Sequence, residues 1–301
     1  MKKKITINSP ARIHIGFLDM GKNSIRKFGS LGLTITNYSY IIEIEKAEKL
    51  QFYCDDLILK EKINQIVLSL KKNYEFSNFK IRILSKIPAH NGLGSGTQLA
   101  LSIGYLITKL NKIKFDINEM TKILKRGLRS GIGIESFKNG GFNIDVGKLE
   151  KSSEPPLNIL NLKWPREWKI ILIIDKNILG IHGKQETKEF KILKEINQNY
   201  SVENCKCLLM KIIPGLIEKN FKEFSGGIRI IQNNMSKIFY GKKDKFASKK
   251  IEQIFKNLEQ INCNSYGQSS WGPTGFVFCE NTKKRNVLLN YLEKYINLKN
   301  I

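Results

Sequence analysis

The stretch Pro88-Ala-His-Asn-Gly-Leu-Gly-Ser-Gly-Thr-Gln98 decides how the rest of the chain is interpreted. It follows an alternating, strand-like run over 79–84 and precedes apolar residues at helical spacing over 99–110, so it predicts a loop that enters a helix. Glycines let the backbone approach an anion, and the unpaired N–H groups of a first helical turn then face that anion. The stretch therefore predicts a phosphate site, with a plain strand-to-helix turn capped by Ser95 as the alternative.

Length and composition predict two domains that share a cleft. The chain has 301 residues, of which 41% are hydrophobic and 10% aromatic, so it is longer than most single domains and can build a core. A polar, proline-containing join over 151–156, followed by Trp164-Pro165, marks the boundary. We therefore expect an N-terminal domain over residues 1–155 and a C-terminal domain over residues 156–301.

The chain is strongly basic, with 51 lysines and arginines against 27 aspartates and glutamates and a net charge of +24. Such a charge suits a polyanionic partner, either a phosphorylated metabolite, a nucleic acid or an acidic membrane surface. A nucleic-acid interface gathers Lys and Arg with exposed aromatic side chains on one surface. Here the basic residues are dispersed and the glycines are clustered, which favours a small phosphorylated ligand over nucleic acid.

Cysteine usage and hydropathy indicate a cytoplasmic protein. The five cysteines are odd in number and include no Cys-x-x-Cys pair, so the sequence indicates neither a zinc site nor a disulfide framework. Polar residues interrupt the N-terminal region, and no apolar run reaches the length of about 18 residues that a membrane span needs. We therefore expect no membrane partner.

A break at Ser9-Pro10 separates two predicted N-terminal strands, the second of which covers 12–19. Strand alternation places Arg12 and His14 on one face of that second strand. Such a face is typical either of a ligand-binding surface or of the solvated side of an edge strand.

Further periodic runs complete an α+β interpretation. Alternation predicts strands over 31–36 and 38–44, and helical spacing predicts helices over 58–70, 116–127, 186–196, 202–220, 221–239, 247–261 and 282–297. Asp116 can cap its helix, with Glu119 at the capping-box position.

Two further glycine-rich segments follow, over 128–147 and 264–278. In the first, Asp145 is predicted to lie on a strand, as a structural carboxylate unless the phosphate loop lies opposite. Three polar, glycine-rich segments far apart in sequence are typical of a composite cleft. We therefore predict that Ser95, Asp145 and Ser270 line one cleft between two α+β domains.

Four segments carry a resemblance to a known family. The pattern Pro88-x-x-x-Gly92-Leu-Gly-Ser95 resembles the phosphate loop of the GHMP kinase superfamily. The chain also resembles the β-ribofuranosylaminobenzene 5′-phosphate synthase family in four segments that occur in the expected order, namely Pro10–Asp19, Gly92–Ala100, Arg129–Asp145 and Gly267–Thr274.

The resemblance implies a two-domain GHMP-kinase-like fold, in which an N-terminal α/β domain like one in ribosomal proteins precedes a C-terminal ferredoxin-like α+β domain. It also implies a phosphoribosyltransferase that condenses phosphoribosyl pyrophosphate with 4-aminobenzoate or 4-hydroxybenzoate and releases carbon dioxide and pyrophosphate. The implied cofactor is Mg²⁺, and the implied setting is the synthesis of tetrahydromethanopterin. A homodimer is left open as the assembly.

Candidate roles follow from the resemblance together with this chemistry. The expected catalytic residues are Asp145, Asp19, His14 and Arg129, because a carboxylate can steady an oxocarbenium-like centre and an arginine can hold a phosphate or a carboxylate. The expected phosphate- and substrate-binding residues are Arg12, His90, Gly92, Gly94, Ser95, Gly96, Thr97, Gln268, Ser269 and Ser270. The expected Mg²⁺ ligands are Asp145 and Ser95.

Gly96 separates this chain from the kinases that the loop resembles. Those kinases commonly carry a second serine at this position, whose hydroxyl can approach a metal or a nucleotide phosphate. Gly96 removes that hydroxyl and so favours the transferase. An ATP-dependent small-molecule kinase of the superfamily is the first alternative, and a basic nucleic-acid-binding protein is the second.

Overall fold

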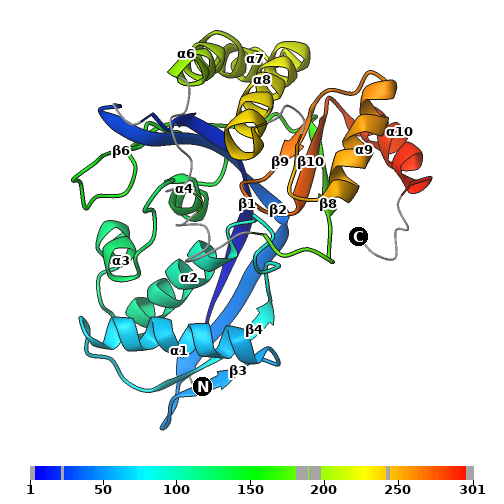
Figure 1. Ribbon diagram of the computed structural model, residues 1–301. Helices are drawn as coiled ribbons and strands as arrows, with labels where there is room; N and C mark the ends of the chain where they lie inside the picture. Colours follow the sequence, from blue (N-terminus) through cyan, green and yellow to red (C-terminus); the bar gives the residue numbers. More distant parts are fainter. Residues whose placement is uncertain (1–3, 22–23, 181–188, 190–197, 242–244, 296–301) are drawn as a thin grey trace.

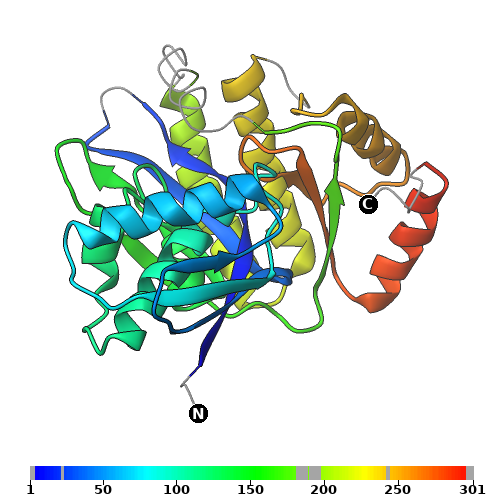
Figure 2. The same cartoon turned by 90° about the horizontal axis from the view of Figure 1, so that it is seen from below.

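The computed structural model describes residues 4–21, 24–180, 189, 198–241 and 245–295, and it shows two β-sheets with helices packed around them (Figure 1). The α+β class predicted from the sequence is confirmed. Seen from below, the N-terminal elements lie on the left and the second sheet with its helices lies on the right (Figure 2).

The first sheet is built on two long antiparallel strands, β1 and β2. Its strand order is β3-β4-β2-β5-β7, and both β1 and β6 also pair with β2. The strands span Ile5–Asp19 (β1), Arg26–Lys46 (β2), Gln51–Tyr53 (β3), Phe79–Ser85 (β4), Phe142–Asp145 (β5), Lys148–Leu149 (β6) and Asn158–Leu162 (β7). β7 follows residue 155 in the chain and pairs with β5, so the first sheet extends a few residues beyond the predicted domain boundary. The boundary itself stays a prediction.

β1 is one continuous strand, so the prediction of a break at Ser9-Pro10 is wrong. Its register with β2 shifts between Pro10 and Ala11, and pairing continues on both sides of the shift. Proline has no N–H to donate to the ladder, and a local irregularity absorbs that loss without ending the strand. The two strands predicted over 31–36 and 38–44 are likewise both part of β2.

Four helices lie on one side of β1 and β2, namely α1 (Leu57–Lys71), α2 (Ser95–Leu110), α3 (Ile117–Ile123) and α4 (Ile132–Lys138) (Figure 1). The predicted cap of α3 is confirmed, because the Asp116 side chain accepts a hydrogen bond from the N–H of Glu119. The helix predicted over 58–70 is α1, and its buried apolar stripe begins at Leu59, since Ile58 is 67% exposed.

α2 is the most deeply buried of these helices. Its apolar side chains, such as Leu99 and Ile103, pack into the core against β1 and β2. Gln98, in the first turn, is also fully buried, accepts a hydrogen bond from Ser9 Oγ and donates one to the carbonyl of Gly133. These bonds hold the N-terminal end of α2 between β1 and α4.

The C-terminal part forms a second, three-stranded sheet with the order β8-β10-β9. Its elements are β8 (Lys169–Ile174), α6 (Gln198–Cys207), the π-helix η1 (Leu208–Ile212), α7 (Ile213–Ile217), α8 (Phe221–Tyr240), α9 (Lys249–Gln260), β9 (Tyr266–Gln268), β10 (Thr274–Cys279) and α10 (Thr282–Glu293). α6 and α8 pack against β1, whereas α9 and α10 accompany the second sheet (Figure 1). The helix predicted over 186–196 falls almost entirely outside the described residues.

Across the described ranges, none of the helices combines the length and the apolar character that crossing a bilayer would require.

Candidate active site

The glycine-rich loop delivers the chain into α2 as the sequence predicted. Gly92 and Gly94 both adopt left-handed conformations, with φ of +75° and +79°, which residues with a side chain rarely adopt. Gly94 occupies the N-cap position, and no side chain caps the helix there, so the alternative of a Ser95-capped turn is wrong. The first turn of α2 therefore presents its N–H groups and the positive end of the helix dipole toward the loop.

Arg12 and Ser269 hold this loop from behind. The Arg12 guanidinium donates to the carbonyl of Gly92, and the backbone N–H of Arg12 donates to the carbonyl of Leu93 at 3.1 Å. Ser269 Oγ donates to the same Gly92 carbonyl at 2.7 Å and accepts from the N–H of His14 at 3.0 Å. Arg12 was predicted to grip substrate, but its guanidinium bonds to the loop itself and thereby fixes the loop's shape.

The third glycine-rich segment packs directly on the first. A Cβ added to Gly272 would lie 2.4 Å from the backbone nitrogen of Gly92, so the two backbones are in contact. The N–H of Gly180 donates to the carbonyl of His90 at 2.8 Å and brings a further glycine to the same point. The predicted association of these distant segments is confirmed.

A cavity of about 640 Å³ lies over the loop and the start of α2. Its described lining comes from β1, α1, the loop, α2, the end of α3 and the β9–β10 connection: Arg12, Lys62, Gln65, Ile66, Ser69, His90, Gly92, Leu93, Gly94, Ser95, Gly96, Thr97, Leu99, Ile123, Leu124, Lys125, Arg126, Ser270, Trp271 and Gly272. The cavity thus combines cationic side chains and helix N–H groups with an apolar wall, which suits a ligand that is anionic at one end and apolar at the other.

Three non-glycine residues of this lining have left-handed backbones. They are His90, Lys125 and Ser270, with φ of 61°, 51° and 56°. Such conformations cost roughly 1–3 kcal/mol each and persist where the surrounding structure imposes them, often at ligand sites. Their gathering around one cavity supports its assignment as the functional site.

Sequence reasoning missed the cations that approach the loop from other elements. Lys62 comes from α1 and lies 3.1 Å from the His90 ring through its Nζ, whereas Lys125 and Arg126 come from the turn after α3. Trp271 closes another side and stacks on Phe239 with ring centroids 4.0 Å apart. No glycine cluster or motif marks Lys62, Lys125 or Arg126 in the sequence. Only the packing of α1 and α3 over the loop reveals these three residues.

Asp145 does not line this cavity, so the predicted cleft of Ser95, Asp145 and Ser270 is wrong for one of its three members. Its side chain is fully buried and accepts hydrogen bonds from Ser30 Oγ and from the N–H groups of Gly131 and Gly147. Burial raises the pKa of Asp145 to about 6, against the opposing effect of these bonds. The carboxylate ties the turn before α4 to the sheet, and none of these three partners belongs to the glycine-rich loop.

Replacement of Asp145 by Asn should remove a pH dependence of stability. The folded-state pKa of about 6 exceeds the ordinary value of 3.8, so the folded chain keeps a proton that the unfolded chain loses in this window. The contribution of Asp145 to the free energy of unfolding therefore falls as pH rises from about 4 to 6, by on the order of 3 kcal/mol. Urea unfolding of both proteins at intervals of pH would check this, and parallel curves would contradict it.

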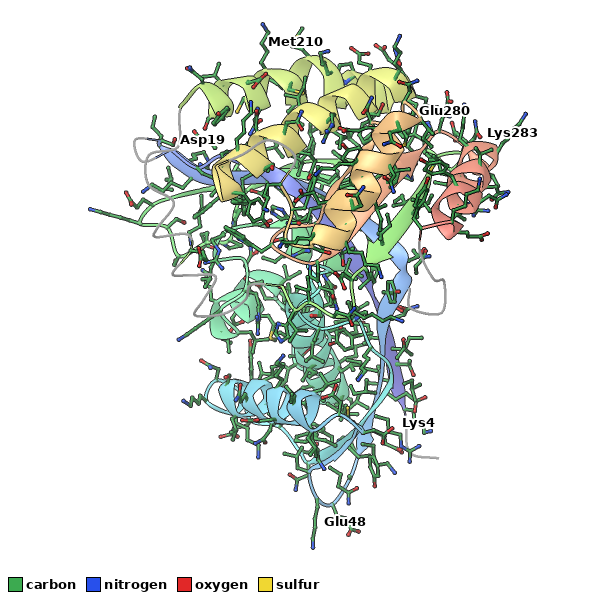
Figure 3. The ribbon with its side chains drawn as sticks, turned by 45° about the vertical axis from the view of Figure 1, so that its right-hand side comes forward. Lys4, Asp19, Glu48, Met210, Glu280 and Lys283 are labelled. Atoms are coloured by element: carbon green, nitrogen blue, oxygen red, sulfur yellow. The ribbon has the colours of Figure 1, made fainter. Side chains whose placement is uncertain are left out.

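Asp19 also stands apart from the loop, and Arg129 does not line the cavity. Asp19 ends β1, seven residues or roughly 23 Å along the strand from Arg12, and it accepts hydrogen bonds from the Gly21 N–H, Ser24 Oγ and Ser201 Oγ. Figure 3 labels it at the end of β1 opposite Lys4. Arg129 precedes Ser130 and is not among the described lining residues. The structure thus keeps Asp19 away from the glycine-rich loop, and Arg129 is not part of the cavity lining.

His14 and Gln268 surround a second, much smaller cavity, of about 10 Å³, which Ser270 also lines. His14 is buried, with Nε2 shielded from solvent and unpaired among the described residues, and its ring packs on Phe17 with centroids 4.6 Å apart. Burial first, and then the charge of Arg12, lower the pKa of His14 to about 3, so the ring is neutral. Gln268 is held by the Ala247 N–H, the Tyr240 hydroxyl and the Ser270 carbonyl.

The donor set at the loop does not fit a resident Mg²⁺ site. Ser95 and Thr97 bring hydroxyl groups, but none of the described lining residues is Asp or Glu. Within the described part of the chain there is also no cluster of three His, Cys, Asp or Glu side chains that could hold a metal. Protein-bound Mg²⁺ usually takes one or two carboxylates together with substrate phosphates, and Asp145 is committed elsewhere.

Comparison with known proteins places the loop and α2 in a known family of domains and identifies relatives along nearly the whole chain. The family described as GHMP kinases N terminal domain matches residues 61–144, which include the loop and α2. A β-ribofuranosylphenol 5′-phosphate synthase of Methanocaldococcus jannaschii is 30% identical over 298 residues, covering 90% of this chain and 88% of that relative. The chain belongs to the β-ribofuranosylphenol 5′-phosphate synthase family. Another protein of that name, from Methanothermobacter thermautotrophicus, is 26% identical over 289 residues, covering 90% of this chain and 87% of its own.

The fold of this synthase-family chain is shared with a kinase. The phosphomevalonate kinase of Streptococcus pneumoniae superposes with a TM-score of 0.71 at 11% identity, covering 97% of this chain and 96% of that structure. The two-domain GHMP-kinase-like fold implied by the sequence resemblance is therefore confirmed, and at this identity the similarity concerns the fold alone.

Proposed function

We propose that this chain transfers the ribose 5-phosphate unit of phosphoribosyl pyrophosphate to a 4-substituted benzoate, in the cytoplasmic synthesis of methanopterin-type carriers. The observation that carries the proposal is the name of the relatives that align with nearly the whole chain, which are β-ribofuranosylphenol 5′-phosphate synthases. The cavity over the loop supplies the two environments that such a reaction needs, one for phosphates and one for an aromatic ring. Because those names specify a phenol, 4-hydroxybenzoate is the preferred acceptor and 4-aminobenzoate the second.

The proposed reaction balances without a further reactant. The ring carbon that bears the carboxylate bonds to the anomeric carbon while the bond to pyrophosphate breaks, and pyrophosphate leaves with its electron pair. The bond between the ring and the carboxylate then breaks, its electron pair restores the aromatic ring, and carbon dioxide leaves. Negative charge therefore develops on pyrophosphate in the first step.

The loop and the start of α2 suit that first step. Their N–H groups and the positive end of the helix are fixed before substrate arrives, because Arg12 and Ser269 hold the Gly92 carbonyl. Such preorganised donors favour the transition state in which charge accumulates on the leaving group. Mg²⁺, in this proposal, arrives with the pyrophosphate group instead of resting on a protein carboxylate.

The apolar wall of the cavity suits the acceptor ring. It is formed by side chains from α1, α2 and the end of α3, namely Ile66, Leu99, Ile123 and Leu124. A flat ring placed against this wall would be shielded from water beside the phosphate loop, and one of the nearby lysines would face its carboxylate.

Labelled carbon dioxide provides the test of this function. We expect the purified protein with Mg²⁺ to release it from carboxyl-labelled 4-hydroxybenzoate or 4-aminobenzoate only when phosphoribosyl pyrophosphate is present, and we expect ATP to be unable to replace that donor. The kinase fold keeps a small-molecule kinase as the second candidate. Turnover of ATP with a small alcohol, together with no carbon dioxide from either benzoate, would establish that candidate instead.

A further inference from the structure

Arg126 sits in a turn whose backbone is fixed on both sides. Lys125 before it and Gly127 after it both have left-handed conformations, with φ of 51° and 70°. The N–H of Arg126 donates to the carbonyl of Thr121 at 2.8 Å. A Cβ on Gly127 would lie 2.5 Å from Ile134 Cδ1, so this glycine is pressed against α4. The turn therefore directs the Arg126 side chain toward the cavity independently of any ligand.

The guanidinium of Arg126 lies against the first turn of α2. Its Nη1 is 3.5 Å from the position that a Cβ on Gly96 would take. Its Nε is shielded from solvent and has no hydrogen-bond partner among the described residues. Burial also lowers the pKa of Arg126 from its ordinary value, although an arginine stays charged. A partly buried guanidinium with an unpaired N–H is costly unless an anion pairs with it.

Gly96 leaves open the space between this guanidinium and the start of the helix. A methyl group at position 96 would make ordinary contact with Arg126 Nη1, so a longer side chain there would have little free space on the side of the guanidinium. A serine at this position would add a hydroxyl group to the space between the first turn of α2 and Arg126. The size of residue 96 therefore sets how much space remains beside Arg126 at the start of α2.

We propose that Arg126 and Gly96 together form the binding site for the diphosphate group of phosphoribosyl pyrophosphate. Arg126 donates N–H groups to phosphate oxygens across the space that Gly96 leaves open, while α2 contacts the same group with its first turn. The diphosphate is assigned here, and not the 5′-phosphate, because it is the more highly charged group and this is where a helix N-terminus and a partly buried cation coincide. The identity of the ligand rests on the proposed function.

Calorimetric titration with two probes tests this assignment. Inorganic pyrophosphate with Mg²⁺ represents the diphosphate, and ribose 5-phosphate represents the other end of the substrate. Arg126→Met should weaken pyrophosphate binding on the order of tenfold to a hundredfold, since it removes charge-assisted hydrogen bonds, and should leave ribose 5-phosphate binding within about twofold. The matched control is Lys122→Met, which removes the same charge from a side chain paired with Glu154 at the surface.

A double-mutant cycle tests the pairing with Gly96. Gly96→Ser should weaken pyrophosphate binding in the wild-type background by about tenfold, and it should have little further effect when Arg126 is already Met. Additive losses, an equal loss for both probes, or a loss as large for Lys122→Met would each overturn the proposal. Urea unfolding of each variant shows whether a loss of binding reflects a loss of the fold.

The outcomes separate this inference from the proposed function. If the protein binds pyrophosphate through Arg126 but releases no carbon dioxide, the diphosphate site is supported and the proposed synthase activity is contradicted. Carbon dioxide release with pyrophosphate binding unchanged in Arg126→Met keeps the activity and overturns the diphosphate site.

Discussion

A Gly92→Ala variant should lose both phosphate binding and several kcal/mol of stability. Its Cβ would lie 2.2 Å from the carbonyl oxygen of Ser269, and its backbone would be held at a φ of +75°. The left-handed conformation alone costs about 1–2 kcal/mol for alanine, and the clash adds about 1–3 kcal/mol because packed backbone must move. Since that movement also disturbs the Gly92 carbonyl held by Arg12 and Ser269, affinity for pyrophosphate should fall by at least about tenfold.

Gly241→Ala is the matched control for this experiment. Gly241 ends α8 with a φ of +68°, and an added Cβ would meet nothing within 4 Å. It therefore carries the same conformational penalty without the clash and lies outside the loop. Urea unfolding should show a loss of about 1–2 kcal/mol for the control, and calorimetry should show unchanged pyrophosphate binding. Equal losses of stability in the two variants would mean that the contact between the loop and Ser269 is looser than described.

Acidification should destabilise the folded chain through His14. The pKa of this ring is lowered from 6.5 to about 3 in the folded state, so below pH 6.5 the unfolded chain binds a proton that the folded chain does not. The contribution of His14 to the free energy of unfolding is fully present above pH 6.5 and is lost as pH falls toward 3. The loss is on the order of 3 kcal/mol at pH 4. His14→Phe keeps a ring against Phe17 and removes the titration, so its stability should decline less between pH 7 and 4.

The wild type and His14→Phe are compared by the slope of the free energy of unfolding against pH and not by its absolute value. Phe17→Leu serves as a control, because it loosens the packing around His14 while leaving the imidazole in place. Its free energy of unfolding should be lower than that of the wild type at every pH but should fall with acid in parallel. If His14→Phe also runs parallel to the wild type, the ring of His14 is accessible to protons in the folded state.

The glycine-rich loop could be predicted because its signal is local. Glycines followed by apolar residues at helical spacing fix both the turn and the helix within about twenty residues, and the helical run predicted over 99–110 lies within α2, which begins at Ser95. The break predicted at Ser9-Pro10 was also a local inference, and there it failed. Pairing with β2 on both sides of Pro10 outweighs the one missing donor, and a propensity argument does not contain that pairing.

The lining of the cavity was harder to predict because it depends on how elements approach each other. Alternation along a strand places Asp145 on a face, but only the position of α4 shows that this face meets the N–H of Gly131 and not the loop. Arg126 belongs to a turn without a motif, and Lys62 to the polar side of an ordinary amphipathic helix. Their place in the cavity lining depends on tertiary distance, which residue type and spacing do not contain.

Strand β1 contacts both the N-terminal sheet and the C-terminal part of the chain, and this limits how the two parts can be exchanged between members of the superfamily. Beyond its pairing with β2, β1 donates its His14 N–H to Ser269, and its Ile15 and Phe17 carbonyls accept from Gln232 and Asn204. A chimaera that joined residues 1–155 to the C-terminal half of a kinase would need matching side chains at those three places. Each unmatched buried group would cost about 1–3 kcal/mol. Recombination within the superfamily therefore calls for crossover points that keep β1 with its C-terminal partners.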